Sequence, residues 1–301
     1  MKLKIKTPAT TANLGPGFDC LGASLSLYNE FEVYVVKNSQ KLRVETEGVD
    51  CELISKKEDN HFYKAIKKIF EITKNEMPSL EIYIKNRIPL KRGLGSSATA
   101  YVAGVVLGNI LCGEPLSENE LLKVALELEG HPDNIVPCMF GGLCISSVVE
   151  GSIKFIKLKL PSDILVLAVI PKHQISTEDA RKILPDKIYF KDAVKNVSNV
   201  ALLVSSLTTK KYEFLKFATE DFLHQPYRKK LMPWMDKVFE ICLDNKALCC
   251  MLSGSGSTVV ALYRKKELDE SLKERLQEKL QKIVDCQVKI LSFTNKGIIV
   301  Y

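Results

Sequence analysis

Residues 89–100, PLKRGLGSSATA, constrain the fold of this chain more than any other segment. Two glycines and two serines at positions 93–97 lead directly into YVAGVVLGNIL at 101–111, which is apolar on every side and predicts a buried helix. A glycine-rich turn that enters a helix presents free N–H groups at the positive end of the helix dipole, where phosphate commonly binds. We interpret the segment as a phosphate-binding loop; the alternative is a tight turn that only precedes a buried helix.

The spacing of this loop differs from two common nucleotide motifs. No Gly-Lys-Ser/Thr follows the glycines, as a Walker A loop requires, and the GxGxxG order of a dinucleotide-binding turn is absent. The sequence therefore predicts an anion site of another type.

Hydrophobic periodicity predicts the remaining elements. The predicted strands are 2–6, 31–36, 81–85, 143–149, 153–159, 164–170, 258–263 and 297–301. The first predicted helix runs from a cap at Asp59 or Asn60 to about Asn75, and the others cover 101–111, the segment from the capping box Ser117–Glu120 to a stop at Pro132, and 266–283. Residues 173–245 are expected to be mainly helical. Strands and helices interleave without regular βαβ spacing, which favours an α+β fold. We place a domain boundary near residue 155, although no flexible linker marks it.

Composition argues against several functional classes. The net charge of +7 comes mostly from scattered lysine pairs, and no arginine-rich arm or zinc-finger spacing supports a nucleic-acid partner. The longest strongly apolar run, Ile164 to Ile170, is too short to span a membrane. The nine cysteines form no CxxC pair, and the N-terminus lacks an apolar signal segment, so we expect reduced thiols and a cytoplasmic protein.

Two further loops of small and polar residues accompany the first. They are Thr7–Asp19, which is expected to follow the first strand directly, and Leu252–Thr258. With residues 89–100 they stand in the order of the motifs of the GHMP kinases, a family that this chain resembles over nearly its whole length. PATTANLGPGFDCLG at 8–22 and EGHPDNIVP at 129–137 are similar to the homoserine kinase branch. One departure is SGSGST at 253–258, where the family more often has a proline before the threonine.

The resemblance implies a fold and a reaction. The fold would comprise a ribosomal-protein-S5-like domain at 1–155, which binds ATP, and a ferredoxin-like domain at 156–301. The reaction would be the ATP-dependent phosphorylation of the side-chain hydroxyl of L-homoserine, with Mg²⁺ accompanying the nucleotide. The resemblance does not decide whether the protein forms a homodimer, and it implies no nucleic-acid or membrane partner.

The resemblance also implies which residues hold the nucleotide. The ATP phosphates would lie against Pro89, Leu90, Lys91, Arg92, Gly93, Leu94, Gly95, Ser96, Ser97, Ala98 and Thr99. Asn60 would lie near the adenine, or would only cap the helix that it precedes. Ser97 and Glu127 would bind Mg²⁺. Glu129 is an alternative ligand, and Glu127 could instead form a surface ion pair with Lys123.

Homoserine is a zwitterion, so its recognition requires both a cation and an anion. By resemblance, Arg181 and Arg228 would bind its carboxylate, which suits the planar guanidinium. Asp19 and Asn13 would contact the ammonium group, and His131 and Thr177 would also face the substrate. The alternatives are solvated arginines and local turn capping by Asn13 and Asp19.

Asp133 and Asn134 are the residues that we expect to orient the reacting hydroxyl. Asp133 would accept its proton late, although an ordinary aspartate is a poor base near pH 7 unless its surroundings raise its pKa. Phosphoryl transfer depends mainly on positioning and charge neutralisation. Three alternatives remain at this point: a GHMP kinase for a sugar or isoprenoid alcohol, a metabolite-binding protein of the same fold without catalysis, and a basic nucleic-acid binder.

Overall fold

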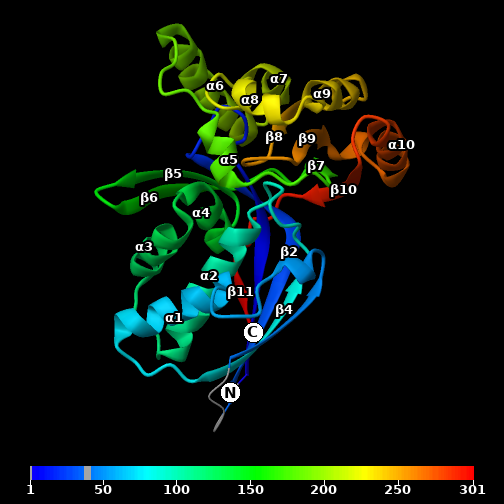
Figure 1. Cartoon of the computed structure of the whole chain (residues 1–301). Coiled ribbons are helices and arrows are strands. Elements are labelled where there is room, and N and C mark those ends of the chain that lie inside the picture. Colours follow the sequence, from blue (N-terminus) through cyan, green and yellow to red (C-terminus); the bar gives the residue numbers. More distant parts are fainter. Residues whose placement is uncertain (1, 37–41) are drawn as a thin grey trace.

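The structure is a computed structural model that describes residues 2–36 and 42–301, and its strands form two sheets (Figure 1). The strands are β1 Lys2–Ala12, β2 Leu21–Val36, β3 Arg43–Gly48, β4 Ser79–Asn86, β5 Leu143–Val149, β6 Ser152–Leu158, β7 Ile164–Pro171, β8 Cys249–Leu252, β9 Val259–Arg264, β10 Cys286–Ser292 and β11 Ile299–Val300. The helices are α1 His61–Thr73, α2 Ser96–Leu111, α3 Glu118–Glu129, α4 Pro132–Phe140, α5 Thr177–Lys182, α6 Phe190–Thr209, α7 Leu215–Ala218, α8 Gln225–Arg228, α9 Met235–Asp244 and α10 Glu270–Gln281.

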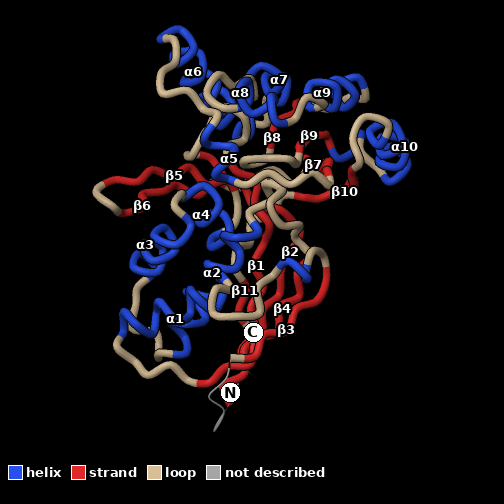
Figure 2. The backbone as a smooth tube through the Cα atoms, in the orientation of Figure 1, coloured by secondary structure: helices blue, strands red, loops and turns tan. Residues whose placement is uncertain are grey.

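The first sheet has the order β11-β1-β2-β4-β3, and the hairpin β5–β6 pairs with β2 and projects to one side (Figure 2). Helices α1 to α4 lie on one side of this sheet (Figure 1). In β4, Leu80, Ile82 and Ile84 are buried while the residues between them are more exposed, as a strand with one covered face requires. These side chains pack with Phe62 and Leu107 of the covering helices.

The second sheet has the order β10-β7-β9-β8, and all its neighbouring strands are antiparallel. Strand β7 is buried on both faces, which explains its continuous apolar run. Val166 and Ala168 belong to a core with α6 and α7, whereas Leu167 and Val169 belong to a core with α9 and α10. The first of these cores also includes Ala9, Leu21 and Leu94, so it joins the two sheets.

The α+β fold class is confirmed, but the prediction that residues 7–19 form a loop is wrong in part. Strand β1 continues through Thr7–Ala12, because its small residues are buried between neighbouring segments and keep pairing with β2. The loop begins at Asn13. Likewise, Pro132 does not only end α3: it is the first residue of α4, a position where the missing N–H of proline costs nothing.

The chain passes from the first sheet to the second between Leu158 and Ile164, and β11 then returns to pair with β1. Residue 155 lies within β6, so the boundary placed there would divide a strand. The division into two domains stays a prediction, with the crossing moved to 159–163. Among the described residues, no helix has both the length and the apolar character that crossing a membrane requires.

Candidate active site

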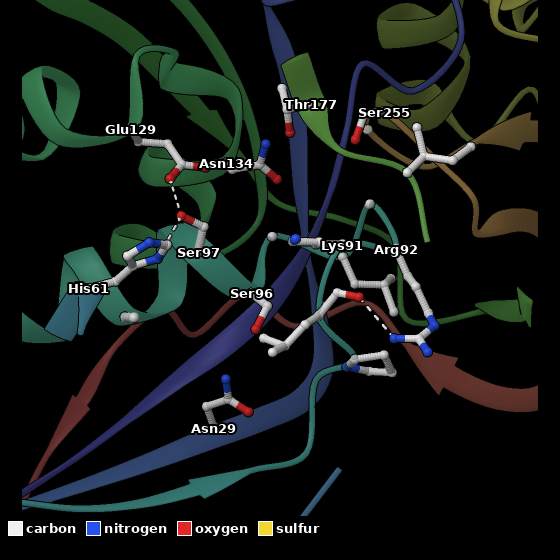
Figure 3. Close-up of a pocket in the computed structure, with 18 of the residues that line it drawn as sticks. Asn29, His61, Lys91, Arg92, Ser96, Ser97, Glu129, Asn134, Thr177 and Ser255 are labelled. Atoms are coloured by element: carbon white, nitrogen blue, oxygen red, sulfur yellow. Dashed lines mark hydrogen bonds between the residues drawn. The ribbon is translucent and has the colours of Figure 1, made fainter. Parts of the chain in front are cut away.

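A cavity of about 410 Å³ collects residues from both halves of the chain (Figure 3). The predicted site residues that line it are Asn13, Asp19, Asn60, Pro89, Leu90, Lys91, Arg92, Gly93, Leu94, Gly95, Ser96, Ser97, Glu129, His131, Asp133, Asn134, Thr177, Arg181 and Arg228. Ala98 and Thr99 are buried behind the loop instead, where the Thr99 hydroxyl donates to the Ser96 carbonyl at 2.7 Å. Asn60 also caps α1, since its side chain accepts from the amides of Phe62 and Tyr63.

The glycine loop is held by its carbonyls, and its amides are left free. The four carbonyls of residues 91–94 accept hydrogen bonds of 2.6–3.1 Å from the amides of Ile175, Thr258 and Thr10 and the hydroxyl of Ser253. Within the part of the chain that the structure describes, none of the amides of residues 91–97 donates a hydrogen bond. A row of unpaired N–H groups at the start of the 16-residue helix α2 suits an anion.

The two glycines of this loop are required by geometry. Gly93 and Gly95 have φ of 74° and 69°, in the left-handed region. A Cβ atom on Gly93 would lie 2.0 Å from the carbonyl oxygen of Ser253, and one on Gly95 would lie 1.9 Å from Oγ1 of Thr10. The close approach of these segments therefore depends on the absence of a side chain.

Arg92 fixes the glycine loop through hydrogen bonds to two other segments. Its Nη1 lies 2.6 Å from Oδ2 of Asp50, and its Nε donates to the carbonyl of Pro171 at 3.0 Å. The same Asp50 oxygen accepts from the amide of Leu90 at 2.9 Å. The guanidinium is thus bonded to β7 and to the turn after β3.

Ser97 and Glu129 form the hard oxygen pair of the site. The Ser97 hydroxyl donates to Oε2 of Glu129 at 2.7 Å, and Nδ1 of His61 lies 3.4 Å from the same hydroxyl (Figure 3). Burial raises the pKa of Glu129 to about 7, and the bond from Ser97 opposes that rise. A carboxylate beside a hydroxyl and free amides fits Mg²⁺ bound together with phosphate.

Glu127, the predicted metal ligand, lies outside the cavity. Its side chain is half exposed at the surface, 3.7 Å from Lys68, and it does not line the cavity. Two residues along a helix correspond to a rotation of about 200°, so Glu127 and Glu129 point in nearly opposite directions. Glu129, the predicted alternative, is the one that reaches Ser97, and Lys68 takes the place expected for Lys123.

Opposite charges meet at the other end of the cavity. Arg181 and Asp19 form a bidentate pair, with N···O distances of 2.6 and 3.0 Å. Arg228 is only 2% exposed, and its guanidinium carbon lies 5.2 Å from the ring centre of Phe18. Arg181 lies 5.3 Å from the same ring. Asn13 donates to the carbonyl of Gly254 and accepts from the amide of Asp19, both at 3.0 Å.

Asp133 lies in the first turn of α4 and is 3% exposed. Burial raises its pKa to about 7; Asp19 adds to the rise and Arg181 opposes it. Next to it, Oδ1 of Asn134 accepts a 2.6 Å bond from the hydroxyl of Thr10. Burial also lowers the pKa of His131 below its ordinary value. The site therefore combines an anion cradle, a cationic pair and a carboxylate that is poised to exchange a proton near neutral pH.

Two family models match this chain. Residues 60–142 match the GHMP kinases N terminal domain, and residues 209–282 match the GHMP kinases C terminal domain. The chain belongs to the GHMP kinase family. The family predicted from the loops is thus confirmed, and membership implies the use of ATP.

Several relatives of this GHMP kinase are similar over most of their length. A homoserine kinase from Carboxydothermus hydrogenoformans is 47% identical over 257 residues, which are 85% of this chain and 84% of the relative. One from Aquifex aeolicus is 41% identical over 301 residues, 99% of each chain. The crystal structure of a homoserine kinase from Cytophaga hutchinsonii superposes with a TM-score of 0.88 at 29% identity, covering 100% of this chain and 97% of that one.

Sequence reasoning missed several residues of this GHMP kinase site. Leu53, Ile54 and Ser255 also line the cavity. Asp50 and Phe18 organise the loop and the arginines from outside the predicted set. For Phe18 the signal was present, since it lies inside the first motif; for Asp50 no local pattern distinguishes it from other turn residues.

Proposed function

We propose that this chain is a homoserine kinase, which transfers the terminal phosphoryl group of ATP to the side-chain hydroxyl of L-homoserine and forms O-phospho-L-homoserine. The names of its relatives support this substrate. The observation that carries the proposal is that a loop of free amides and the side chains of Asp19, Arg181 and Arg228 line one and the same cavity.

The nucleotide would lie along the glycine loop, with its phosphates on the amides of residues 91–97 and its base toward Leu53, Ile54 and Asn60. Ser97 and Glu129 would hold Mg²⁺, and the metal would neutralise charge on the phosphate oxygens. Among the described residues no group of three His, Cys, Asp or Glu side chains forms a metal site, so phosphate and water would complete the coordination.

The amino acid would lie at the charged end. Its carboxylate would contact the guanidiniums of Arg228 and Arg181, and its ammonium group would contact Asp19. Asn13, His131 and Thr177 line the same region. Mevalonate has no ammonium group and a sugar has no charge, so neither would pair with all three charged side chains, Asp19, Arg181 and Arg228.

In the transfer step, a bond would form between the hydroxyl oxygen and the γ-phosphorus, and the bond from that phosphorus to the β,γ-bridging oxygen would break. ADP would carry away the bridging oxygen. Asp133 would accept the hydroxyl proton, for which a pKa near 7 is well suited, and Asn134 would orient the hydroxyl. We also place the reaction in the cytoplasm, which fits nine cysteines without a disulfide.

The test is an ADP-release assay with ATP, Mg²⁺ and a panel of homoserine, threonine, serine, mevalonate, shikimate and galactose. We expect turnover to be highest with homoserine. Activity confined to mevalonate or a sugar would overturn the substrate while leaving the family intact.

A further inference from the structure

A buried histidine lies directly behind the substrate-facing Arg228. His224 is fully buried, precedes α8, and does not line the cavity. Its ring stacks on Phe18 with a centroid distance of 5.3 Å. It belongs neither to the anion cradle nor to the charged groups that would touch a substrate, so its burial needs another explanation.

The hydrogen bonds of Arg228 show what the histidine does. The Nε of Arg228 donates to the carbonyl of Ala180 at 3.1 Å, and Nη1 donates to the carbonyl of Gly254 at 2.9 Å. Nη1 also lies 3.2 Å from Nδ1 of His224. Within residues 2–36 and 42–301, Nη2 makes no hydrogen bond to the protein. Three donors are therefore fixed by the protein, and the Nη2 pair is left for a ligand in the cavity.

The partners of His224 determine its tautomer. Its Nε2 lies 2.8 Å from the carbonyl oxygen of Gly15, which can only accept, so Nε2 carries the hydrogen. Nδ1 faces Nη1 of Arg228, which can only donate, so Nδ1 is bare. Oδ2 of Asp221 lies 3.4 Å from Nε2, but it already accepts from the amides of His224 and Gln225 at 3.0 and 2.6 Å.

A charged imidazole is disfavoured at this position. A second hydrogen on Nδ1 would point at a guanidinium 3.2 Å away, inside the protein and out of contact with water. Burial lowers the pKa of His224 to about 4, with Asp221 opposing the decrease and Arg228 adding to it. The ring is thus a neutral hydrogen-bond acceptor for Arg228 across the working pH range.

We propose that His224 is a positioning residue: its Nδ1 accepts from Nη1 of Arg228, its Nε2–H is fixed on the Gly15 carbonyl, and together these bonds aim Nη2 at the substrate carboxylate. This inference rests on the proposed function, since it assigns that carboxylate to Arg228. It connects the loop after β1 to the arginine of α8 through one side chain.

Two substitutions separate the two bonds. His224→Asn keeps an acceptor oxygen near the position of Nδ1 and loses the donor to Gly15. His224→Gln keeps a donor that reaches toward Gly15 and loses the acceptor for Arg228. We expect His224→Gln to raise KM for homoserine about tenfold, the equivalent of one lost hydrogen bond, while His224→Asn raises it no more than about threefold. KM for ATP should change less than about twofold in both, since the glycine loop is not touched.

His173→Gln is the matched control, because that histidine is exposed and lies outside the cavity; its kinetics should equal those of the parent. Equal KM values for homoserine in His224→Gln and the parent, or an equal rise in the Asn and Gln variants, would overturn the inference. A parent enzyme that does not turn over homoserine would instead overturn the proposed function.

A measurement on the unmodified protein covers the case in which the variants fail to fold. The ¹⁵N NMR shifts of the His224 ring should show a protonated Nε2, a bare Nδ1 and no titration between about pH 6 and 8. A protonated Nδ1, or a charge change within that range, would contradict the proposed role whatever the kinetics.

Discussion

At the residue scale, Asp133 combines burial with a carboxyl group whose pKa is raised to about 7. If its carboxylate accepts the hydroxyl proton, kcat/KM should rise with pH through about 7 and level off above it, because the ionised form grows over that range. Asp133→Asn should lower kcat about a hundredfold or more and remove this inflection at saturating Mg²⁺. A loss of less than about tenfold in steady-state turnover would exclude essential base catalysis.

The same carboxyl group should make the fold less stable at high pH. Its folded-state pKa lies above its unfolded value of 3.8, so the folded state prefers the proton, and stability falls as pH rises from about 4 to about 7. Asp133→Asn cannot ionise. We therefore compare the free energy of unfolding of Asp133→Asn minus that of the parent at two pH values. This difference should be larger at pH 8 than at pH 4, by on the order of 1–4 kcal/mol. Urea unfolding of both proteins at both pH values measures this quantity. An equal variant-minus-parent difference at pH 4 and pH 8 would refute the prediction.

Glu129 and Glu127 provide a matched pair for the metal. Glu129→Gln replaces the carboxylate that accepts from Ser97, so the Mg²⁺ concentration for half-maximal activity should rise about tenfold or more. Glu127→Gln only removes a half-exposed group near Lys68 and should leave that concentration unchanged. Equal effects of the two substitutions in a Mg²⁺ titration would argue against the proposed ligand.

These residues also show how far sequence reasoning reaches. The motifs predicted that Asp19, Ser97, Asp133, Arg181 and Arg228 belong to one site, and the cavity brings them together. The choice between Glu127 and Glu129 depended on where α3 ends and how it is rotated, which a spacing argument leaves open. The bidentate pair of Asp19 with Arg181 joins residues 162 positions apart and has no local signature.

At the scale of elements, the turn into α2 depends on a glycine without a Cβ atom. Gly93→Ala would place that atom 2.0 Å from the Ser253 carbonyl at a positive φ, so it should cost more than about 2 kcal/mol of stability and raise KM for ATP at least about tenfold. The comparison is Gly113→Ala after the same helix. Gly113 also has a positive φ, but a Cβ atom there meets nothing within 4 Å, so it should cost only about 1 kcal/mol.

Kinetics and thermal unfolding of both variants would measure these effects. Gly113→Ala should keep the parent's KM for ATP, because the strain lies at the far end of α2. Similar KM values in Gly93→Ala and the parent would show that the glycine turn does not shape the nucleotide site.

Elements with strong local signals were predicted well. Helix α1 begins after its Asn60 cap, and α3 begins with the predicted Ser117–Glu120 capping box. Strand β1 was predicted too short, because threonine and alanine carry a weak strand signal and their pairing with β2 is a tertiary effect. Helix α4 was missed because proline was interpreted only as a stop.

At the scale of the whole molecule, the two halves are joined by several long-range bonds. Strand β11 returns to β1, Arg92 binds the carbonyl of Pro171, and the carbonyl of Gly93 accepts from Ser253. These pairings join distant positions, and no periodicity in the sequence indicates them. The resemblance to the GHMP kinases implied two domains but not how firmly the two halves are connected.

Such connections predict one cooperative unfolding transition. Trp234 is the only tryptophan and packs against the core of α9 and α10, so its fluorescence reports on the second half. Its urea transition should coincide with that of far-UV circular dichroism, which reports on both halves. A fluorescence midpoint separated from the dichroism midpoint would show that the halves unfold independently.

The bond between Asp19 and Arg181 has a consequence for the proposed reaction. An amino acid would enter by ion exchange: its ammonium group replaces Arg181 at Asp19, and its carboxylate replaces Asp19 at Arg181. The total charge of the pocket is the same before and after. A hydroxy acid has only a carboxylate to pair with Arg181, so Asp19 would lose its counterion. An amino alcohol has only an ammonium group to pair with Asp19, so Arg181 would lose its counterion. Molecules of similar shape but unequal charge would thus be rejected by a contact that the protein makes with itself.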